Sequence, residues 1–351
     1  MKYNINNSEL QKIYTLLNKD EDNRMMSDFI IDIIENGKEI GSLALNENID
    51  LFKAICNYYK VDRTFIKHLN EVEFKKSITL LNVEDYKNNP YYKNVHLESI
   101  KDNNISIEYV SFNAYQPILC DNITVDRNHI EHTCIGYFNE DIKYPQIKAD
   151  GSVWMLITPH EIKTMEKPIK EATGNVLVFG LGLGYFPYMI SIKDNVNKIT
   201  IVEKDKKIIK MFKEHILPFF EHKEKITIIE DNAKNFIEND FDYNYCFIDL
   251  WFDTLDGLPL YIYFKNKEKK HPNTKFDYWI EDSMLIMLSR LFYTILYNDL
   301  NGIKMPYDVI NDEYDIIANK MYNKLKDVEI TQYKDVEKLL TIESLINSIL
   351  D

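Results

Sequence analysis

Residues 176–185 read Val-Leu-Val-Phe-Gly-Leu-Gly-Leu-Gly-Tyr, and this stretch decides the fold class. A short apolar run is followed by glycines at alternate positions, Gly180, Gly182 and Gly184, ahead of a predicted helix. Glycines allow a tight turn and let a ligand touch the backbone. In a parallel sheet such a turn lies at the carboxyl ends of the strands, where nucleotides bind. The stretch therefore predicts a nucleoside-binding strand–turn–helix unit.

Apolar runs alternate with helical segments downstream of this stretch, and the clearest helical segment is Lys206 to Phe220. Nearly continuous apolar strands that alternate with helices predict a buried parallel sheet. We therefore expect an α/β fold with a doubly wound, mostly parallel, Rossmann-like sheet. The predicted strands are NVLVFG (175–180), KITIVE (198–203), KITIIE (225–230) and YCFIDL (245–250), with FDYWIE (276–281) as a candidate fifth strand.

The start of the α/β domain is marked by a helix N-terminus. Thr158 is a predicted N-cap, Pro159 occupies the first helical position, and Glu161 stands three residues after the cap, which is the pattern of a capping box. This helix should continue to about Ala172 and stop at Gly174.

The rest of the chain divides by its patterning. Helical spacing precedes the α/β domain, with a third helical pattern near Leu51 to Leu69 and a polar connection at 83–104. Short β-branched runs such as ISIEYVSF follow this connection and predict β-hairpins. The predicted segments are a helical region at 1–104, β-hairpins at 105–157, the nucleoside-binding α/β domain at 158–300 and C-terminal helices at 301–351.

Composition limits the function classes. The 351-residue chain has a formal net charge of −14, and an acidic surface repels phosphate backbones, so nucleic acid is an unlikely partner. No stretch reaches the roughly 18 apolar residues of a membrane span, and the N-terminus lacks the apolar core of a signal peptide. We expect a cytoplasmic protein that acts on a small-molecule or protein acceptor. Composition does not decide whether the chain forms a homo-oligomer.

The four cysteines are scattered and form no CxxC pair. Reduced thiols are the simple expectation for such a chain. Cys120, His129, His132 and Cys134 lie close in sequence, but their spacing fits no standard zinc pattern, so we predict no metal site.

The spacing of the glycines separates two nucleotide classes. A dinucleotide fingerprint, G-x-G-x-x-G, would place its third glycine at 185, where this chain has Tyr185, so an NAD oxidoreductase is disfavoured. The G-x-G-x-G pattern resembles motif I of class I S-adenosylmethionine-dependent methyltransferases. Glu203 ends the next strand, 203 − 184 = 19 residues after the last glycine, where an acid can accept hydrogen bonds from both ribose hydroxyls. The resemblance further implies that Asp231 or Asn232, after the third strand, contacts adenine.

Within that superfamily the chain looks most like the spermidine synthase branch. This branch tends to have an apolar residue two positions before the first glycine, where this chain has Val178. The branch also has β-hairpins before the domain. Asp249 stands where the branch has its catalytic aspartate. The loop departs from the branch's Gly-Gly-Gly-Asp-Gly, and the segment after Asp249 lacks the branch's Asp-Pro step. The first hundred residues have no counterpart in the resemblance, which covers about 150–300.

The resemblance implies chemistry at a sulfonium, which is already a strong electrophile, so the protein must align a nucleophile and exclude water. An amine acceptor must lose a proton, and a nearby carboxylate can take it. We assign this role to Asp249, with Asp253 as second acid; Asp249 could alternatively cap the strand or bind the donor's amino group. Tyr185, Trp251 and Phe252 are expected as walls of the acceptor site, with packing as the alternative for the last two.

Three functions remain open from the sequence. The leading one is an S-adenosylmethionine-dependent methyltransferase that acts on a small molecule or a protein. The second is an aminopropyltransferase that uses decarboxylated S-adenosylmethionine. The third is a non-catalytic nucleoside-binding or scaffold protein, whose crevice would either bind ligand without turnover or be filled by Tyr185 and Phe186.

Overall fold

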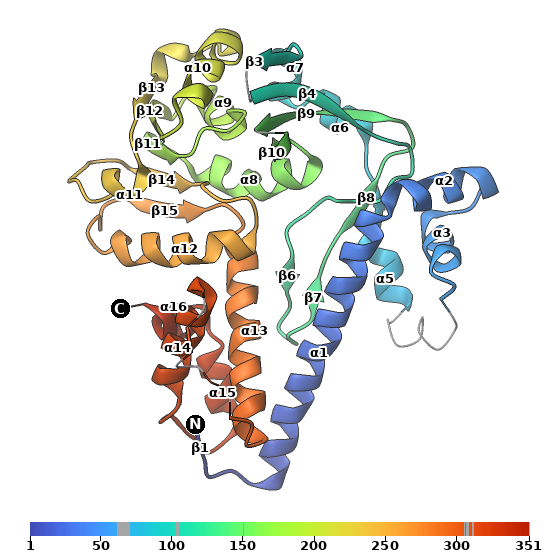
Figure 1. Cartoon of the computed structure of the whole chain (residues 1–351), viewed down its shortest axis with the longest axis vertical. Helices are drawn as coiled ribbons and strands as arrows, with labels where there is room; N and C mark the ends of the chain where they lie inside the picture. Colours follow the sequence, from blue (N-terminus) through green and yellow to red (C-terminus); the bar gives the residue numbers. More distant parts are fainter. Residues whose placement is uncertain are drawn as a thin grey trace.

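The structure is a computed structural model, and it describes residues 1–61, 71–102, 105–149, 151–304, 306, 309–310 and 312–350. It is a mixed α/β architecture in which a parallel sheet is joined to an antiparallel sheet and to long helices (Figure 1). No helix in these ranges is both long enough and apolar enough to cross a membrane.

The parallel sheet has its first strand, β11, in the middle. The strand order is β13-β12-β11-β14-β15, and every neighbouring pair is parallel. The order therefore reverses beside β11, which is the position where such sheets open a crevice. The strands are β11 (Gly174–Phe179), β12 (Val196–Glu203), β13 (Ile226–Glu230), β14 (Tyr245–Ile248) and β15 (Lys275–Tyr278). All five predicted strands are confirmed.

The helices between these strands begin at the caps that the sequence indicates. The Thr158 hydroxyl accepts from the N–H of Glu161 and the Asp205 carboxylate accepts from the N–H of Lys207. The segment predicted as a helix to Phe220 ends earlier, because Pro218 cannot continue it and a 3₁₀ turn follows. The helices are α8 (Pro159–Glu171), α9 (Tyr185–Ser191), α10 (Lys206–His215), α11 (Ala233–Phe236) and α12 (Thr254–Glu268), and the 3₁₀ turns are Leu217–Phe219 and Lys223–Lys225.

An antiparallel sheet stands before the α/β domain. Its order is β10-β9-β4-β3, and β4 coincides with the predicted run ISIEYVSF. Strand β4 pairs with both β3 and β9. Its pairing with β9 is long-range, whereas β9 and β10 are consecutive antiparallel strands and form a hairpin in the segment where hairpins were predicted. Strand β9 itself was not predicted, because Pro145 and Gln146 interrupt its apolar pattern. The strands are β3 (Ile100–Asp102), β4 (Ile105–Phe112), β9 (Ile142–Ala149) and β10 (Ser152–Leu156).

Four short strands lie between β4 and β9, and β2, which precedes β4, pairs with one of them. One small sheet has the order β2-β8-β5, and a separate hairpin pairs β6 with β7. A disulfide joins Cys120 to Cys134 across this segment, with their Cα atoms 5.7 Å apart. The expectation of four reduced thiols is therefore corrected for these two. The strands are β2 (Ile78–Leu80), β5 (Ile118–Leu119), β6 (Thr124–Val125), β7 (Glu131–His132) and β8 (Ile135–Tyr137).

The N-terminal region is helical, as predicted. Its first helix, α1, is unbroken over 29 residues, and the pattern near Leu51 to Leu69 is a helix at its start, while its end lies outside the described residues. The segment 83–104, which was predicted as a connection, contains two short helices and a strand. Tyr86 and Tyr91 of these helices are buried. The helices are α1 (Asn7–Glu35), α2 (Gly37–Glu47), α3 (Leu51–Tyr58), α5 (Glu71–Ser77), α6 (Val83–Lys87) and α7 (Pro90–Asn94).

The N-terminus lies beside the C-terminal helices in the lower part of the view (Figure 1). Strand β1 (Lys2–Tyr3) pairs in parallel with β16 (Glu329–Ile330), and the N-terminal amine binds the Asp299 carboxylate. Helix α1 is also bound to α13, since Arg24 donates to the carbonyl of Arg290. The C-terminal part is helical, as predicted, with α13 (Glu281–Leu300), α14 (Glu313–Leu325), α15 (Tyr333–Leu339) and α16 (Ile342–Ile349).

Candidate functional site

A cavity of about 500 Å³ lies at the carboxyl ends of the parallel strands. Its walls come from the ends of β11, β12, β13 and β14, from the first turns of α11 and α12, and from β10 of the antiparallel sheet. This is the crevice that the strand order predicts, and its size is in the range of ligand pockets. The lining residues are Trp154, Met155, Gly180, Leu181, Gly182, Val202, Glu203, Lys204, Asp231, Asn232, Ala233, Lys234, Asp249, Leu250, Trp251, Phe252, Asp256 and Leu260.

The glycine loop has the backbone that only glycine adopts easily. Gly180, Gly182 and Gly184 have φ angles of 97°, 50° and 73°, which L side chains rarely take. A Cβ at Gly180 would come within 2.0 Å of the carbonyl oxygen of Asp249, so the loop packs directly on the end of β14. Gly180 and Gly182 line the cavity, whereas Gly184 caps α9 against the ring of Phe212.

Glu203 lies in the cavity wall at the end of β12, and its side chain is buried. Its carboxylate accepts a 2.8 Å hydrogen bond from the N–H of Asp205. Burial nevertheless raises the pKa of Glu203, since the backbone N–H groups offset only part of the desolvation. The carboxyl group is therefore fixed in place, with an orientation set by the chain itself.

Asp231 and Asn232 follow β13 and also line the cavity. The Asn232 side chain accepts from the N–H of Lys234 and so caps α11, while the Asp231 carboxylate accepts from the N–H of Asn232. Asp231 is half-buried and Asn232 is exposed. These bonds use one oxygen of each side chain, so Asp231 retains a second carboxylate oxygen that can accept a further bond.

Asp249 stands at the end of β14, directly across the loop from Glu203. Its N–H donates to the carbonyl of Phe179, which holds the backbone, but no described group binds its carboxylate. Burial raises the pKa of Asp249 to about 7. A carboxyl group in a cavity wall without a partner is placed to bind a cation or to take a proton near neutral pH.

Glu161 is a residue that the sequence analysis treated only as part of a capping box. It lies in the first turn of α8, and no described hydrogen-bond partner meets its carboxylate. Burial, and then the charge of Asp249, raise the pKa of Glu161 well above its usual value. Two half-buried carboxyl groups therefore lie near each other, although they are far apart in sequence and no local pattern could have paired them.

The aromatic residues after β14 take different positions. Trp251 is 6% exposed and lines the cavity, and its indole N–H has no partner among the described residues. Phe252 is 57% exposed at the rim, opposite Trp154 of β10, which is 40% exposed. Trp154 was not among the predicted site residues, because nothing in its local sequence separates it from a strand residue that packs.

Besides Gly184, two predicted site residues do not line the cavity. Asp253 is the N-cap of α12. Its carboxylate accepts hydrogen bonds from the N–H groups of Leu255 and Asp256, so its role here is to cap the helix. Tyr185 points into the core, where its hydroxyl accepts from Asn89 and its ring contacts Tyr91. The structure therefore separates both from Asp249. It also leaves the crevice open, since neither Tyr185 nor Phe186 fills it.

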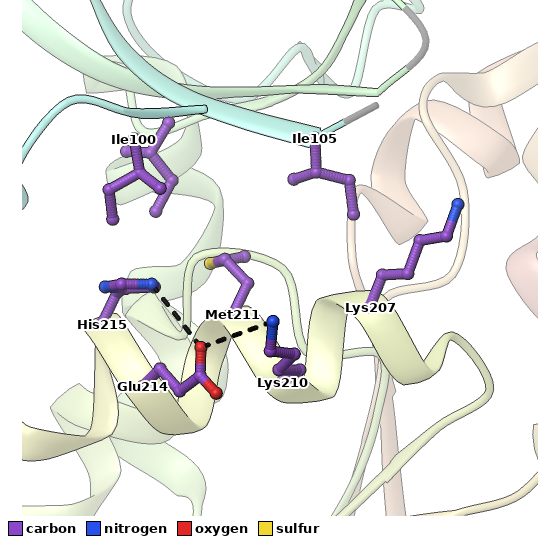
Figure 2. A pocket seen from close by; sticks show the side chains of 8 residues that line it. Ile100, Ile105, Lys207, Lys210, Met211, Glu214 and His215 are labelled. Carbon is purple, nitrogen blue, oxygen red and sulfur yellow. Dashed lines mark ion pairs between the residues drawn. The ribbon is translucent and has the colours of Figure 1, made fainter. Parts of the chain in front are cut away.

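A smaller cavity of about 110 Å³ lies between β3, β4 and α10. Figure 2 shows Ile100 and Ile105 facing α10, where Glu214 forms ion pairs with Lys210 and His215. Its charged lining residues, Lys207, Lys210, Glu214 and His215, all lie on α10, so no second element brings a reactive group to this cavity. The described residues also contain no cluster of His, Cys, Asp or Glu that could hold a metal ion.

Comparison with known proteins gives matches to structures only. No protein-family model matches the chain, and no curated protein matches it significantly. The spermidine synthase of Thermotoga maritima is 14% identical over 43% of this chain and 58% of its own, with a TM-score of 0.30. A spermidine synthase bound to the transition-state analogue AdoDATO is 15% identical over 43% of this chain and 60% of its own, with a TM-score of 0.32. Trm5 of Methanocaldococcus jannaschii, solved with adenosine, is 18% identical over 34% of this chain and 36% of its own, with a TM-score of 0.24.

These matches are partial in both directions. Each covers less than half of this chain, and the chain spans less than two thirds of the length of each structure. The function of this chain is therefore inferred from the cavity and its residues.

Proposed function

We propose that this chain is a transferase that takes its group from S-adenosylmethionine, or from the decarboxylated form, and passes it to an amine. The observation that carries the proposal is the unpartnered Asp249 carboxyl group, in one cavity with the glycine loop and the buried Glu203. One end of the cavity can fix a nucleoside and the other can receive a proton. Methyl transfer to a small molecule or a protein is the reaction that the glycine pattern favours.

The donor would lie across the sheet edge from β13 to β14. Glu203 would accept hydrogen bonds from the ribose hydroxyls, and the segment Asp231 to Asn232 would meet adenine. Because β11 lies between β12 and β14, the part of the donor beyond the ribose would cross the glycine loop toward Asp249. The sulfonium supplies an electrophilic carbon at that end.

Asp249 would hold the acceptor amine and take its proton. The amine lone pair forms a C–N bond to the carbon on sulfur, the C–S bond breaks, and its electron pair returns to sulfur as a thioether. The amine proton passes to the carboxylate, whose pKa near 7 suits both capture and release of the proton at neutral pH. Trp154 and Phe252 at the rim would contact the acceptor's apolar part and help to exclude water.

Aminopropyl transfer is the second candidate, and the charge distribution in the cavity favours it. The lysines among the described lining residues, Lys204 and Lys234, follow β12 and β13, on the far side of the loop from Asp249. The end near Asp249 thus offers carboxyl groups and no described cation. A donor without a carboxylate carries more positive charge there and suits that end better.

Calorimetry with the purified chain tests the proposal. We would titrate S-adenosylmethionine, its decarboxylated form, S-adenosylhomocysteine and NAD into the wild type and into Glu203→Ala. Binding of an adenosyl sulfur ligand that is weakened at least tenfold in the variant supports the proposal, since both ribose hydrogen bonds are lost. Binding of NAD alone, or of no ligand, contradicts it. Asp205→Ala is a matched control, because that carboxylate caps α10 outside the cavity.

A further inference from the structure

Three N–H groups of the glycine loop already have partners within the chain. The N–H of Gly180 donates to the carbonyl of Val202 at 3.1 Å, and the N–H of Gly184 donates to the carbonyl of Leu181 at 2.9 Å. The N–H of Leu183 donates to the sulfur of Met155 at 3.1 Å. A donor carboxylate that lay over this loop would need such N–H groups, since charged oxygens bind strongly only when they accept hydrogen bonds.

Met155 reaches the loop from another sheet. It lies on β10, and a Cβ at Gly182 would stand 2.2 Å from its sulfur, so the thioether packs on the loop backbone. The pairing of β10 with β9 shifts between Val153 and Met155, and this bulge leaves the adjacent residues Trp154 and Met155 both facing the cavity. A regular strand would point two adjacent side chains to opposite faces, and bulges near sites re-aim side chains in this way.

A thioether cannot replace the carboxylate's binding partners. Sulfur in methionine is a weak, uncharged acceptor, so it satisfies the Leu183 N–H and offers no donor in return. The side chain also fills the space over Gly182. A carboxylate there would meet sulfur, lose water, and face the Asp249 carboxyl group.

We propose that Met155 is the specificity-determining residue for the donor, because it closes the glycine loop to a carboxylate and so selects decarboxylated S-adenosylmethionine. This inference rests on the proposed function and decides between its two reactions. A donor that ends in an amine carries no anionic group and needs no N–H group from the loop.

Two substitutions separate the roles of the side chain. Met155→Ala removes the sulfur and its volume, and thus exposes the Leu183 N–H to a ligand. Met155→Leu frees the same N–H but keeps the space filled. We would measure binding of S-adenosylmethionine, of its decarboxylated form, and of 5′-methylthioadenosine, which shares the nucleoside and sulfur but lacks the amino-acid end. Circular dichroism checks that the variants fold.

The expected result is that the wild type binds the decarboxylated donor more tightly. Met155→Ala should bind S-adenosylmethionine about tenfold more tightly than the wild type does, the effect of a gained charge-assisted hydrogen bond. Met155→Leu should not gain it, and 5′-methylthioadenosine should bind all three proteins alike.

Two outcomes overturn the inference alone. They are equal binding of both donors to the wild type, and an unchanged ratio of donor affinities in Met155→Ala, each with normal binding of 5′-methylthioadenosine. If 5′-methylthioadenosine and both donors fail to bind the folded wild type, the proposed function fails as well.

Discussion

The hydroxyl of Tyr91 donates a 2.6 Å hydrogen bond to the carbonyl oxygen of Leu183, and this bond ties α7 to the glycine loop. Asn89 and Asn94 at the ends of the same helix donate to the hydroxyls of Tyr185 and Tyr188 on α9. The segment before the α/β domain is therefore part of the support of the candidate site. Neither Tyr91 nor the two asparagines line the cavity, so the short helix supports the loop from outside it.

Tyr91→Phe should weaken both the fold and the site. The change leaves the buried Leu183 carbonyl without its partner, which costs about 1–3 kcal/mol of unfolding free energy. Urea unfolding measures this loss, and titration with 5′-methylthioadenosine measures the effect on the loop. Tyr297→Phe, at a half-exposed position of α13, is the control and should change neither. Equal stability of Tyr91→Phe and the control would contradict a supporting role for α7.

The rate of transfer should fall as the pH drops below about 7. A carboxyl group takes a proton only when ionised, and burial raises the pKa of Asp249 to about 7, so the active form is lost on the acidic side. The pH profile of kcat/KM measures this limb. Asp249→Asn should abolish turnover and keep binding of 5′-methylthioadenosine.

Glu161→Gln is the matched control for that profile. Burial alone raises the pKa of Asp249, so replacing the neighbouring Glu161 carboxyl group by an amide of similar size should leave that pKa unchanged. The acidic limb should therefore stay near pH 7 in this variant. A limb that moves with Glu161→Gln, or one that persists in Asp249→Asn, would assign the proton transfer to another group.

Asp249→Asn should also change how stability depends on pH. The unfolded carboxyl group ionises near 3.8 and the folded one near 7, so the folded chain binds more protons between these values. The contribution of Asp249 to stability is thus greatest at low pH and is lost as the pH rises toward 7. From pH 5 to pH 8, the unfolding free energy of the variant should rise by roughly 1–3 kcal/mol relative to that of the wild type, as measured by urea unfolding. No relative gain would mean that water reaches the carboxyl group freely.

Reduction of the Cys120–Cys134 disulfide should destabilise the segment between β4 and β9. The two cysteines are 14 residues apart, and closing a loop of this length contributes about 3 kcal/mol. Thermal unfolding with and without reductant measures the change. The double variant Cys120→Ser/Cys134→Ser should unfold at the same temperature as the reduced wild type. Reductant should not change that temperature. Alkylation of both cysteines in unfolded, unreduced protein would show that the bond is absent.

The sequence by itself determined the parallel sheet and the crevice at the carboxyl ends of its strands. The strands could be located because buried parallel strands are continuous apolar runs, and the glycine loop because its backbone excludes other residues. Caps such as Asp205 were also visible, since a cap acts within a few residues. Glu203, Asp231, Asn232 and Asp249 were placed in one cavity for the same reason, because each follows a recognisable strand.

Only the tertiary structure decided what surrounds that cavity. Met155 reaches the loop through the bulge between β9 and β10, Glu161 approaches Asp249 from α8, and Tyr185 turns into the core where Tyr91 meets it. The Cys120–Cys134 bond depends on how β5 and β8 pair. These relations join residues through packing between separate elements, and hydrophobic periodicity records which face of a segment is buried but not which partner buries it.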